Sequence, residues 1–133
     1  MRTLFVRVRA AAANARAIAE HFHGHPAIED VLYPGLADFA GHAIAARQMK
    51  GGFGAMLSIR VKGGEQSAIA TAADVRIWKR ATSLGGVESL MEHRASVEDA
   101  SSLCPRDLLR LSVGIEEVGD LIADLEQALK HPR

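Results

Sequence analysis

The feature that most constrains the fold is a run from Leu108 to Ile115 in which apolar and polar residues alternate. Alternation is typical of a β-strand, because successive side chains point to opposite faces of a sheet. One face then carries only apolar side chains, namely Leu109, Leu111 and Val113. The other carries a mixture, namely Leu108, Arg110, Ser112 and Gly114. An arginine in mid-strand is costly to bury unless it is paired. We therefore expect the Arg110 face to be covered by a group that supplies an anion, or to be open to solvent.

The rest of the chain predicts a small mixed fold. Apolar residues at helical spacing predict helices from just after Val8 to Phe22, then over residues 42–49, 65–74 and 119–130. Short apolar runs closed by Gly or Pro predict further strands over 28–33, 56–61 and 75–81. Residues 94–107 are polar and without a period, which indicates a loop. The strands are few and short, and no glycine-rich dinucleotide turn follows the first. We expect an α+β fold with a small, largely antiparallel sheet and helices packed on one face.

Length and composition bound the class of protein. A chain of 133 residues fits one domain, and 48% hydrophobic and 24% charged residues are normal for a globular protein. No apolar run approaches the ~18 residues that a membrane span needs, and no secretion signal is recognisable, so we expect no membrane association. The single cysteine, Cys104, excludes an internal disulfide. The expected location is cytoplasmic.

The charge balance argues against a nucleic-acid partner. Sixteen basic and sixteen acidic residues cancel, and no basic cluster is dense enough to bind a polyanion. The charge is nevertheless uneven: residues 1–62 carry eight Lys/Arg against four Asp/Glu, and 98–133 carry four against eight. This asymmetry favours two surfaces that face different surroundings.

Two groups of side chains are of types that bind metals or react, but structural roles explain them better than a metal site or a catalytic site does. His21, His23 and His25 lie at the end of the first predicted helix, where alternate positions diverge. Solvated or helix-capping histidines are favoured there, and a metal site requires the chain to be extended. Cys104 lies in a polar loop without a His/Asp pair nearby in sequence, so we interpret it as an unreactive thiol. We expect no metal site.

Two glycine-rich segments allow anion-binding backbone shapes. The first, Gly51–Gly54, leads into a predicted strand rather than a helix N-terminus, so a helix-to-strand turn is favoured over a phosphate cradle. The second, Ser83-Leu84-Gly85-Gly86, can direct successive N–H groups at one point. If its strand neighbours that of Arg110, loop and guanidinium together suit a carboxylate. The alternative is a tight turn beside a surface salt bridge, and the residues alone favour neither.

Longer motifs resemble a known enzyme family. They are Tyr33-Pro34-Gly35-Leu36, Gln48-Met49, residues 52–58 (GFGAMLS), residues 83–90 (SLGGVESL), residues 109–116 (LRLSVGIE) and residues 120–125 (DLIADL). In this order they resemble the C-terminal domain of the Cys/Met-metabolism enzymes that use pyridoxal phosphate (PLP). That family includes cystathionine γ-synthase, the cystathionine lyases, methionine γ-lyase and O-acetylhomoserine sulfhydrylase. The resemblance covers essentially the whole chain.

The resemblance implies roles for individual residues. Arg110 matches the family's arginine that binds the substrate α-carboxylate, and Ser83, with Leu84, lies in the same carboxylate site. Thr82 occupies the position that tunes reaction specificity; some lyases carry glutamate there, so β- versus γ-chemistry and elimination versus replacement stay open. Residues 92–96 (EHRAS) depart from the family's proline-containing version. The implied activity is transsulfuration or carbon–sulfur lyase chemistry on sulfur amino acids.

The family's PLP machinery is not recognisable in these residues. The four lysines, Lys50, Lys62, Lys79 and Lys130, all lie outside the family's S-x-T-K context. A lysine must form the Schiff base with PLP, so we expect residues 1–133 to be the single substrate-carboxylate domain of a longer enzyme, inactive alone and without bound PLP.

A second hypothesis belongs to another class of protein. The chain is then a standalone binding or oligomerisation module that buries the Arg110 face against itself or a partner. On both hypotheses the surface that meets a large domain in the family is exposed, so we expect self-association.

Overall fold

The computed structural model describes residues 2–130, which form four α-helices, five strands and one short 3₁₀ helix. In chain order the elements are α1 (Leu4–Phe22), β1 (Ile28–Leu32), α2 (His42–Gln48), β2 (Met56–Val61), α3 (Gly64–Asp74), β3 (Lys79–Arg80), β4 (Leu90–His93), the 3₁₀ helix (Arg94–Ser96), β5 (Leu108–Ser112) and α4 (Val118–Leu129). The expected helices and strands are confirmed in order, although α1 begins at Leu4 rather than after Val8 and further differences occur around β3 and β4.

One five-stranded sheet has the order β1-β2-β5-β4-β3. β5 lies at its centre and pairs antiparallel with β2 and with β4, and β1 pairs antiparallel with β2. Only the two-residue strand β3 runs parallel to its neighbour, β4. The sheet is therefore largely antiparallel, as predicted.

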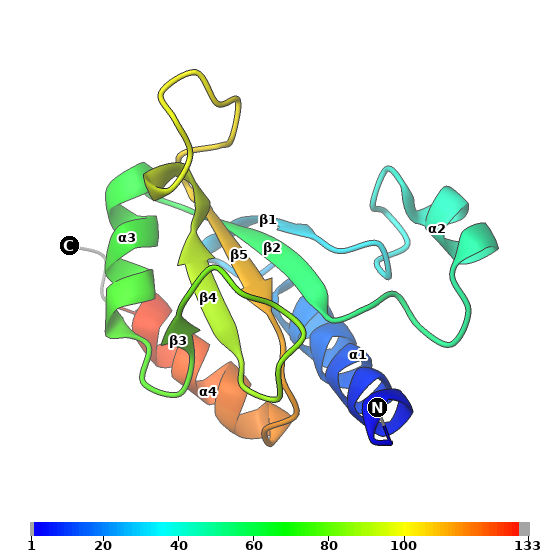
Figure 1. Ribbon diagram of the computed structural model, residues 1–133. Coiled ribbons are helices and arrows are strands. Elements are labelled where there is room, and N and C mark those ends of the chain that lie inside the picture. The colour runs from blue at the N-terminus through cyan, green and yellow to red at the C-terminus, as the bar shows by residue number, and fades with distance from the viewer. Residues whose placement is uncertain (1, 131–133) are drawn as a thin grey trace.

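Helices α1, α3 and α4 cover the same face of this sheet (Figure 1). The core between the two layers is apolar, and each layer contributes side chains that are almost fully buried. Among them are Ile18, Phe22, Leu109, Leu111, Val113, Leu121 and Leu125. The alternation in β5 is thus satisfied, since its apolar face packs under the helices. The short helix α2 contributes no buried residue and lies apart from the sheet (Figure 1).

The strand expected over residues 75–81 is mostly wrong, because only Lys79–Arg80 join the sheet. The backbone N–H groups of Arg76, Ile77 and Trp78 donate instead to the Asp124 carboxylate of α4. Trp78 is buried, and its indole N–H donates to the carbonyl of Leu121 at 3.1 Å. A side chain far along the sequence therefore takes the hydrogen bonds that a longer strand would have made.

Strand β4 was not expected. Its sequence, Leu90 to His93, is two apolar residues followed by two polar ones, and all four are buried. The segment therefore lacks the alternation that would have indicated a strand. The loop expected over 94–107 is confirmed except at its start, where residues 94–96 form one 3₁₀ turn.

The segment Gly51–Gly54 is the predicted helix-to-strand turn. It joins α2 to β2, and φ is positive at Gly51, Gly52 and Gly54. The carbonyl of Gly54 accepts a hydrogen bond from the buried Tyr33 hydroxyl at 3.0 Å. The phosphate-cradle alternative has no support here, because the turn leads into a strand rather than into a helix N-terminus.

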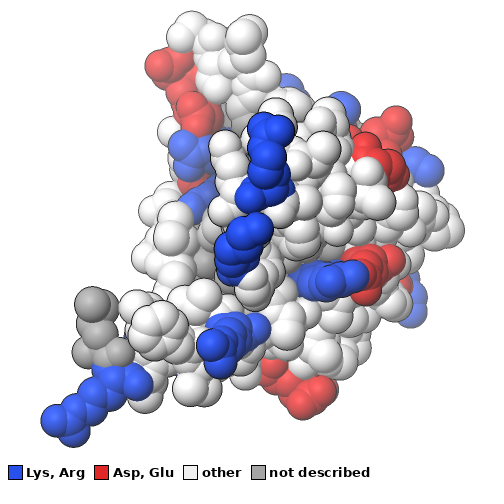
Figure 2. All heavy atoms as spheres, turned by 90° about the vertical axis from the view of Figure 1, so that its right-hand side faces the viewer, with Lys and Arg blue, Asp and Glu red and all other residues white. Residues whose placement is uncertain are grey.

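One face of the molecule carries several basic side chains (Figure 2). Figure 2 shows Lys and Arg side chains gathered on the face near α2 and the N-terminal half of α1. Arg9 on α1, Arg47 on α2 and Lys50 just after α2 are all exposed. Separately, no helix within residues 2–130 combines the length and the apolar character that crossing a membrane requires.

Candidate functional site

Arg110 lies in the middle of the central strand and points to the face of the sheet that the helices leave uncovered. Its neighbours Leu109 and Leu111 are fully buried on the opposite face, and its own side chain retains 21% of its exposure. The strand partners of Arg110 are Ser58 on β2 and Glu92 on β4. Of the two alternatives expected for this face, an anion or solvent, each is met in part: Glu92 supplies a carboxylate, and the Arg110 side chain stays partly exposed.

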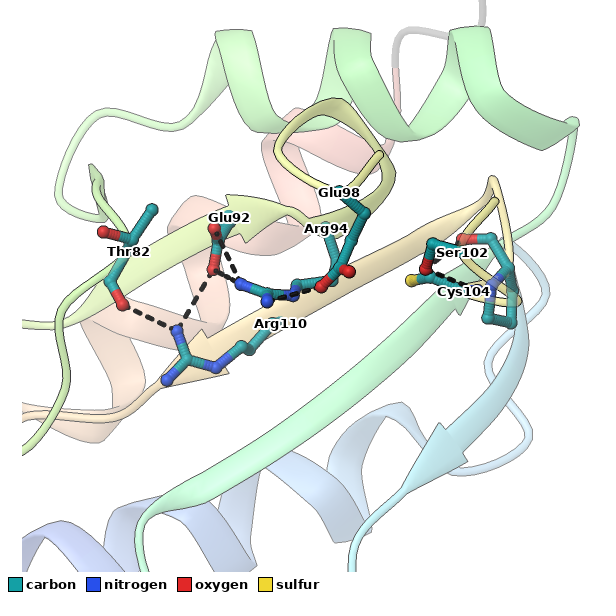
Figure 3. A network of polar contacts seen from close by, with 8 residues as sticks. Thr82, Glu92, Arg94, Glu98, Ser102, Cys104 and Arg110 are labelled. Carbon is teal, nitrogen blue, oxygen red and sulfur yellow. Dashed lines mark hydrogen bonds and ion pairs between the residues drawn. The ribbon is translucent and has the colours of Figure 1, made fainter. Parts of the chain in front are cut away.

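The Arg110 guanidinium is held by two contacts, both at the same nitrogen (Figure 3). Its Nη1 donates to the carbonyl of Thr82 at 2.9 Å and to Oε2 of Glu92 at 3.1 Å. The Glu92 side chain is 4% exposed and also accepts from Nη1 of Arg94, which lies 3.2 Å from each of its oxygens. Arg94 in turn pairs with Glu98. The result is a chain of alternating charges along β4 and the turn that follows it.

The loop at residues 82–86 follows β3. It reaches Arg110 on β5 although β3 and β5 are not neighbours in the sheet. β4 lies between β3 and β5, and the loop passes across β4 (Figure 1). Thr82 contacts Arg110 through its backbone carbonyl, while the Gly85 N–H donates to the Ser112 hydroxyl at 3.3 Å. The two predicted components therefore converge, but by a different route from the one expected.

Ser83 and Leu84 lie in this loop and are exposed, Leu84 to 58%. Neither side chain donates to or accepts from Arg110 within the described residues. The Gly85 N–H, which the sequence offered for an anion nest, is already used by Ser112. Of the four predicted site residues, the structure joins Arg110 and Thr82 directly and brings Ser83 and Leu84 to the same side of the sheet.

Sequence reasoning missed the residues that hold the loop to the strand. Ser89 is fully buried, and its hydroxyl donates to Oε2 of Glu116 at 2.8 Å and accepts from the Gly114 N–H at 2.8 Å. Oε1 of Glu116 accepts from the Ser89 N–H at 2.6 Å. These bonds tie residues 83–90 to residues 109–116. The signal was present, because Ser89 and Glu116 each belong to one of the motifs quoted above.

The three histidines are divided between two carboxylates. Nε2 of His21 lies 2.8 Å and Nε2 of His25 3.3 Å from Oε1 of Glu126, while His23 lies 3.1 Å from Asp38. The hydrogen bond from His21, followed by the charge of His25, lowers the pKa of Glu126. Residues 2–130 contain no group of three or more His, Cys, Asp or Glu side chains placed to hold a metal ion.

Cys104 lacks the surroundings of a catalytic thiol. Burial, and then the nearby negative charge of Glu98, raise its pKa. A reactive cysteine needs the opposite shift, toward the thiolate. Its Sγ lies 3.6 Å from the carbonyl of Pro105 (the loop is seen in Figure 3).

None of the lysines fits the role of a PLP-binding lysine. Lys50, Lys62, Lys79 and Lys130 are all exposed. A Schiff-base lysine lies in a closed pocket that holds the cofactor against the substrate. The described lysines therefore do not fit the Schiff-base role, whereas the Arg110 guanidinium already meets one carboxylate, that of Glu92.

Comparison with known proteins gives a consistent match. The family model described as "Cys/Met metabolism PLP-dependent enzyme" matches residues 1–130. The chain is 48% identical to cystathionine gamma-synthase of Mycobacterium tuberculosis over 134 aligned positions, covering 97% of the chain and 34% of that protein. It is 41% identical to L-methionine gamma-lyase of Fusobacterium nucleatum, covering 98% of the chain and 35% of that protein.

Solved structures share the fold. A cystathionine gamma synthase from Xanthomonas oryzae in complex with aminoacrylate and cysteine superposes with a TM-score of 0.90 and 46% identity, covering 97% of this chain and 35% of that one. The chain thus spans about a third of the length of the relatives that it matches.

Proposed function

We propose, since the chain belongs to the family of Cys/Met metabolism PLP-dependent enzymes, that it supplies the substrate α-carboxylate site of such an enzyme. The substrate class is sulfur amino acids, as in the named relatives, and the reaction is transsulfuration or carbon–sulfur bond cleavage. Residues 1–133 then act as one substrate-carboxylate domain. PLP, when bound in such an enzyme, would supply the electron sink for chemistry at the substrate α-carbon. We assign its binding to residues outside these 133, because the four lysines here are exposed.

One observation carries this proposal: Arg110 has an unused edge on the open face of the sheet. Both of its contacts fall on Nη1, so Nε–H and Nη2–H have no partner among the described residues. Two parallel N–H groups suit the two oxygens of a carboxylate. Ser83 and Leu84 are exposed beside Thr82 and complete the site that we propose. Such anchoring accelerates a reaction by orienting the amino acid.

The proposal is tested by titrating the chain with an amino acid and with its amide. The ¹⁵N-labelled chain is mixed with L-methionine or L-methioninamide, and the Nε–Hε resonance of Arg110 is followed by NMR. That resonance is identified by its loss in Arg110→Lys. We expect a saturable shift in the millimolar range with L-methionine and none with the amide, which lacks the carboxylate. Equal responses to both compounds, or none to either, would contradict the carboxylate site.

A second candidate function is a non-enzymatic self-associating module. The observation in its favour is an apolar surface at the start of α1, where Phe5 is 74%, Val6 72% and Val8 53% exposed. We propose that this surface is covered by self-association of the chain. Sedimentation equilibrium distinguishes the two functions when combined with the titration. A dimer that does not bind L-methionine supports the self-associating module. Binding of L-methionine at any oligomeric state supports the carboxylate site.

The cellular location that we propose is the cytoplasm. It is supported by the single cysteine, which rules out an internal disulfide, and by the metabolic enzymes among the relatives.

A further inference from the structure

Glu92 is a buried carboxylate whose place in the sheet is fixed by its strand. It lies directly opposite Arg110 in the antiparallel pairing of β4 with β5, and its side chain is 4% exposed. Both flanking residues of β4, Met91 and His93, are buried as well. His93 is held by Ser96 and by the carbonyl of Arg106, at 2.5 and 2.7 Å from its two ring nitrogens. The backbone that carries Glu92 is therefore anchored on both sides of it.

The contact between Glu92 and Arg110 selects which edge of the guanidinium stays available. Nη1 is taken by Oε2 of Glu92 and by the carbonyl of Thr82. The remaining edge consists of Nε–H and the adjacent Nη2–H, which point the same way in the planar group. A guanidinium tethered at Nη1 cannot turn about its Nε–Cζ bond without breaking both bonds. The tether thus presents one fixed pair of donors.

Glu92 holds Arg110 without fully neutralising it. Arg94 Nη1 lies 3.2 Å from each Glu92 oxygen, so the carboxylate divides its charge between two guanidinium groups. Arg94 is further paired with Glu98, a half-buried side chain at the other end of the network (Figure 3). Buried carboxylates are costly unless paired and hydrogen-bonded, and Arg94 supplies the second partner.

From this geometry we infer that Glu92 is a positioning residue for Arg110. Glu92 orients the Nε–Nη2 edge of the arginine toward the incoming carboxylate. The inference rests on the proposed function, because it assigns a role in the same site. Glu92 does not touch the substrate and acts only through the arginine. Glu98, which belongs to the same network but does not contact Arg110, has no such role.

The test compares three variants of the full chain in the titration with L-methionine. Glu92→Gln removes the charge and keeps the shape, Glu92→Asp keeps the charge and withdraws it from Arg110, and Glu98→Gln is the matched control. For Glu92→Gln and Glu92→Asp we expect binding about tenfold weaker, the loss typical of one hydrogen bond to a charged group. For Glu98→Gln we expect unchanged binding. Thermal melting establishes that each variant is folded at the temperature of the titration.

A spectroscopic signature separates positioning from general stability. In the free wild-type chain at low temperature, we expect separate Nη1 and Nη2 resonances for Arg110, because the tether slows rotation of the guanidinium. These resonances should merge in Glu92→Gln and stay separate in Glu98→Gln. Merged resonances in the wild-type chain would overturn the inference without any variant, as would wild-type affinity in a folded Glu92→Gln or Glu92→Asp. If the wild-type chain does not bind L-methionine but shows separate Nη1 and Nη2 resonances for Arg110, the proposed function is wrong, whereas the restraint of Arg110 by Glu92 is confirmed.

Discussion

At the scale of single residues, buried carboxylates organise the segments around the site. Asp124 is 5% exposed, and its two oxygens accept from the N–H groups of Arg76, Ile77 and Trp78 at 2.7–3.2 Å. Gln127 donates to it as well, at 3.1 Å. This one side chain fixes where β3 begins, and β3 leads into the loop that carries Thr82.

Replacing Asp124 with asparagine tests this role. An amide offers only one acceptor oxygen, so buried N–H groups lose their partner and its NH₂ group faces donors. We expect Asp124→Asn to lower the free energy of unfolding by about 3 kcal/mol, measured by urea denaturation. Asp120→Asn, an exposed change on the same helix, should cost less than about 1 kcal/mol. Equal losses in the two variants would show that the carboxylate of Asp124 has no special role.

Prediction from sequence succeeded where a residue's surroundings depend on its own strand. Alternation in β5 was enough to place Arg110 opposite the core, because strand geometry alone fixes that relation. The same alternation could not identify Glu92 as the partner of Arg110. That pairing depends on the register of β4, whose four buried residues carry no alternating pattern. Asp124 was out of reach for the same reason, since its partners lie 46 to 48 positions away.

At the scale of elements, contacts between histidines and a carboxylate join the end of α1 to α4. His21 and His25 both contact Glu126, across more than a hundred positions of sequence. The pair of histidines lowers the pKa of Glu126, chiefly through the hydrogen bond from His21. The histidines were predicted to be solvated or to cap the helix: His21 and His23 are exposed and His23 is the C-cap residue, but His21 and His25 also join α1 to a second helix.

This lowered pKa predicts how stability depends on pH. The ionised Glu126 is stabilised in the folded chain, so its contribution is complete above the ordinary glutamate pKa of about 4.3 and is lost as the pH falls through the lowered folded value. The stability difference between the wild type and Glu126→Gln should therefore shrink below about pH 4.3. Chemical denaturation between pH 6 and 3 measures it, with Glu29→Gln, an exposed carboxylate on β1, as the control. A difference that stays constant or grows over this range would refute the contact.

At the scale of the whole molecule, β5 is the element on which both the core and the site depend. It is the central strand, with Leu109 and Leu111 fully buried on one face and Arg110 on the other. The fold class followed from sequence because this pattern and the amphipathic helices agree. The extent of the edge strand β3 could not be predicted from sequence, because hydrogen bonds to a side chain of α4 cut this strand short.

The central strand should therefore be sensitive to loss of apolar volume. We expect Leu109→Ala to lower the free energy of unfolding by about 2–5 kcal/mol, because it leaves a cavity between the sheet and the helices. Leu103→Ala makes the same change at a side chain that is 98% exposed, and should cost less than about 0.5 kcal/mol. Urea denaturation of both variants checks the pair. A similar cost at both positions would be inconsistent with this core.

The central claim is that Arg110 binds the α-carboxylate of an amino-acid substrate, and a chimeric enzyme tests it most directly. The part of the Xanthomonas oryzae cystathionine gamma synthase that matches this chain is replaced by this chain, and formation of cystathionine is measured with and without Arg110→Lys. Lysine keeps the charge and removes the two-donor edge. We expect an active chimera in which Arg110→Lys raises KM for the amino-acid substrate by about tenfold or more, while PLP stays bound. An unchanged KM in the Arg110→Lys chimera would contradict it.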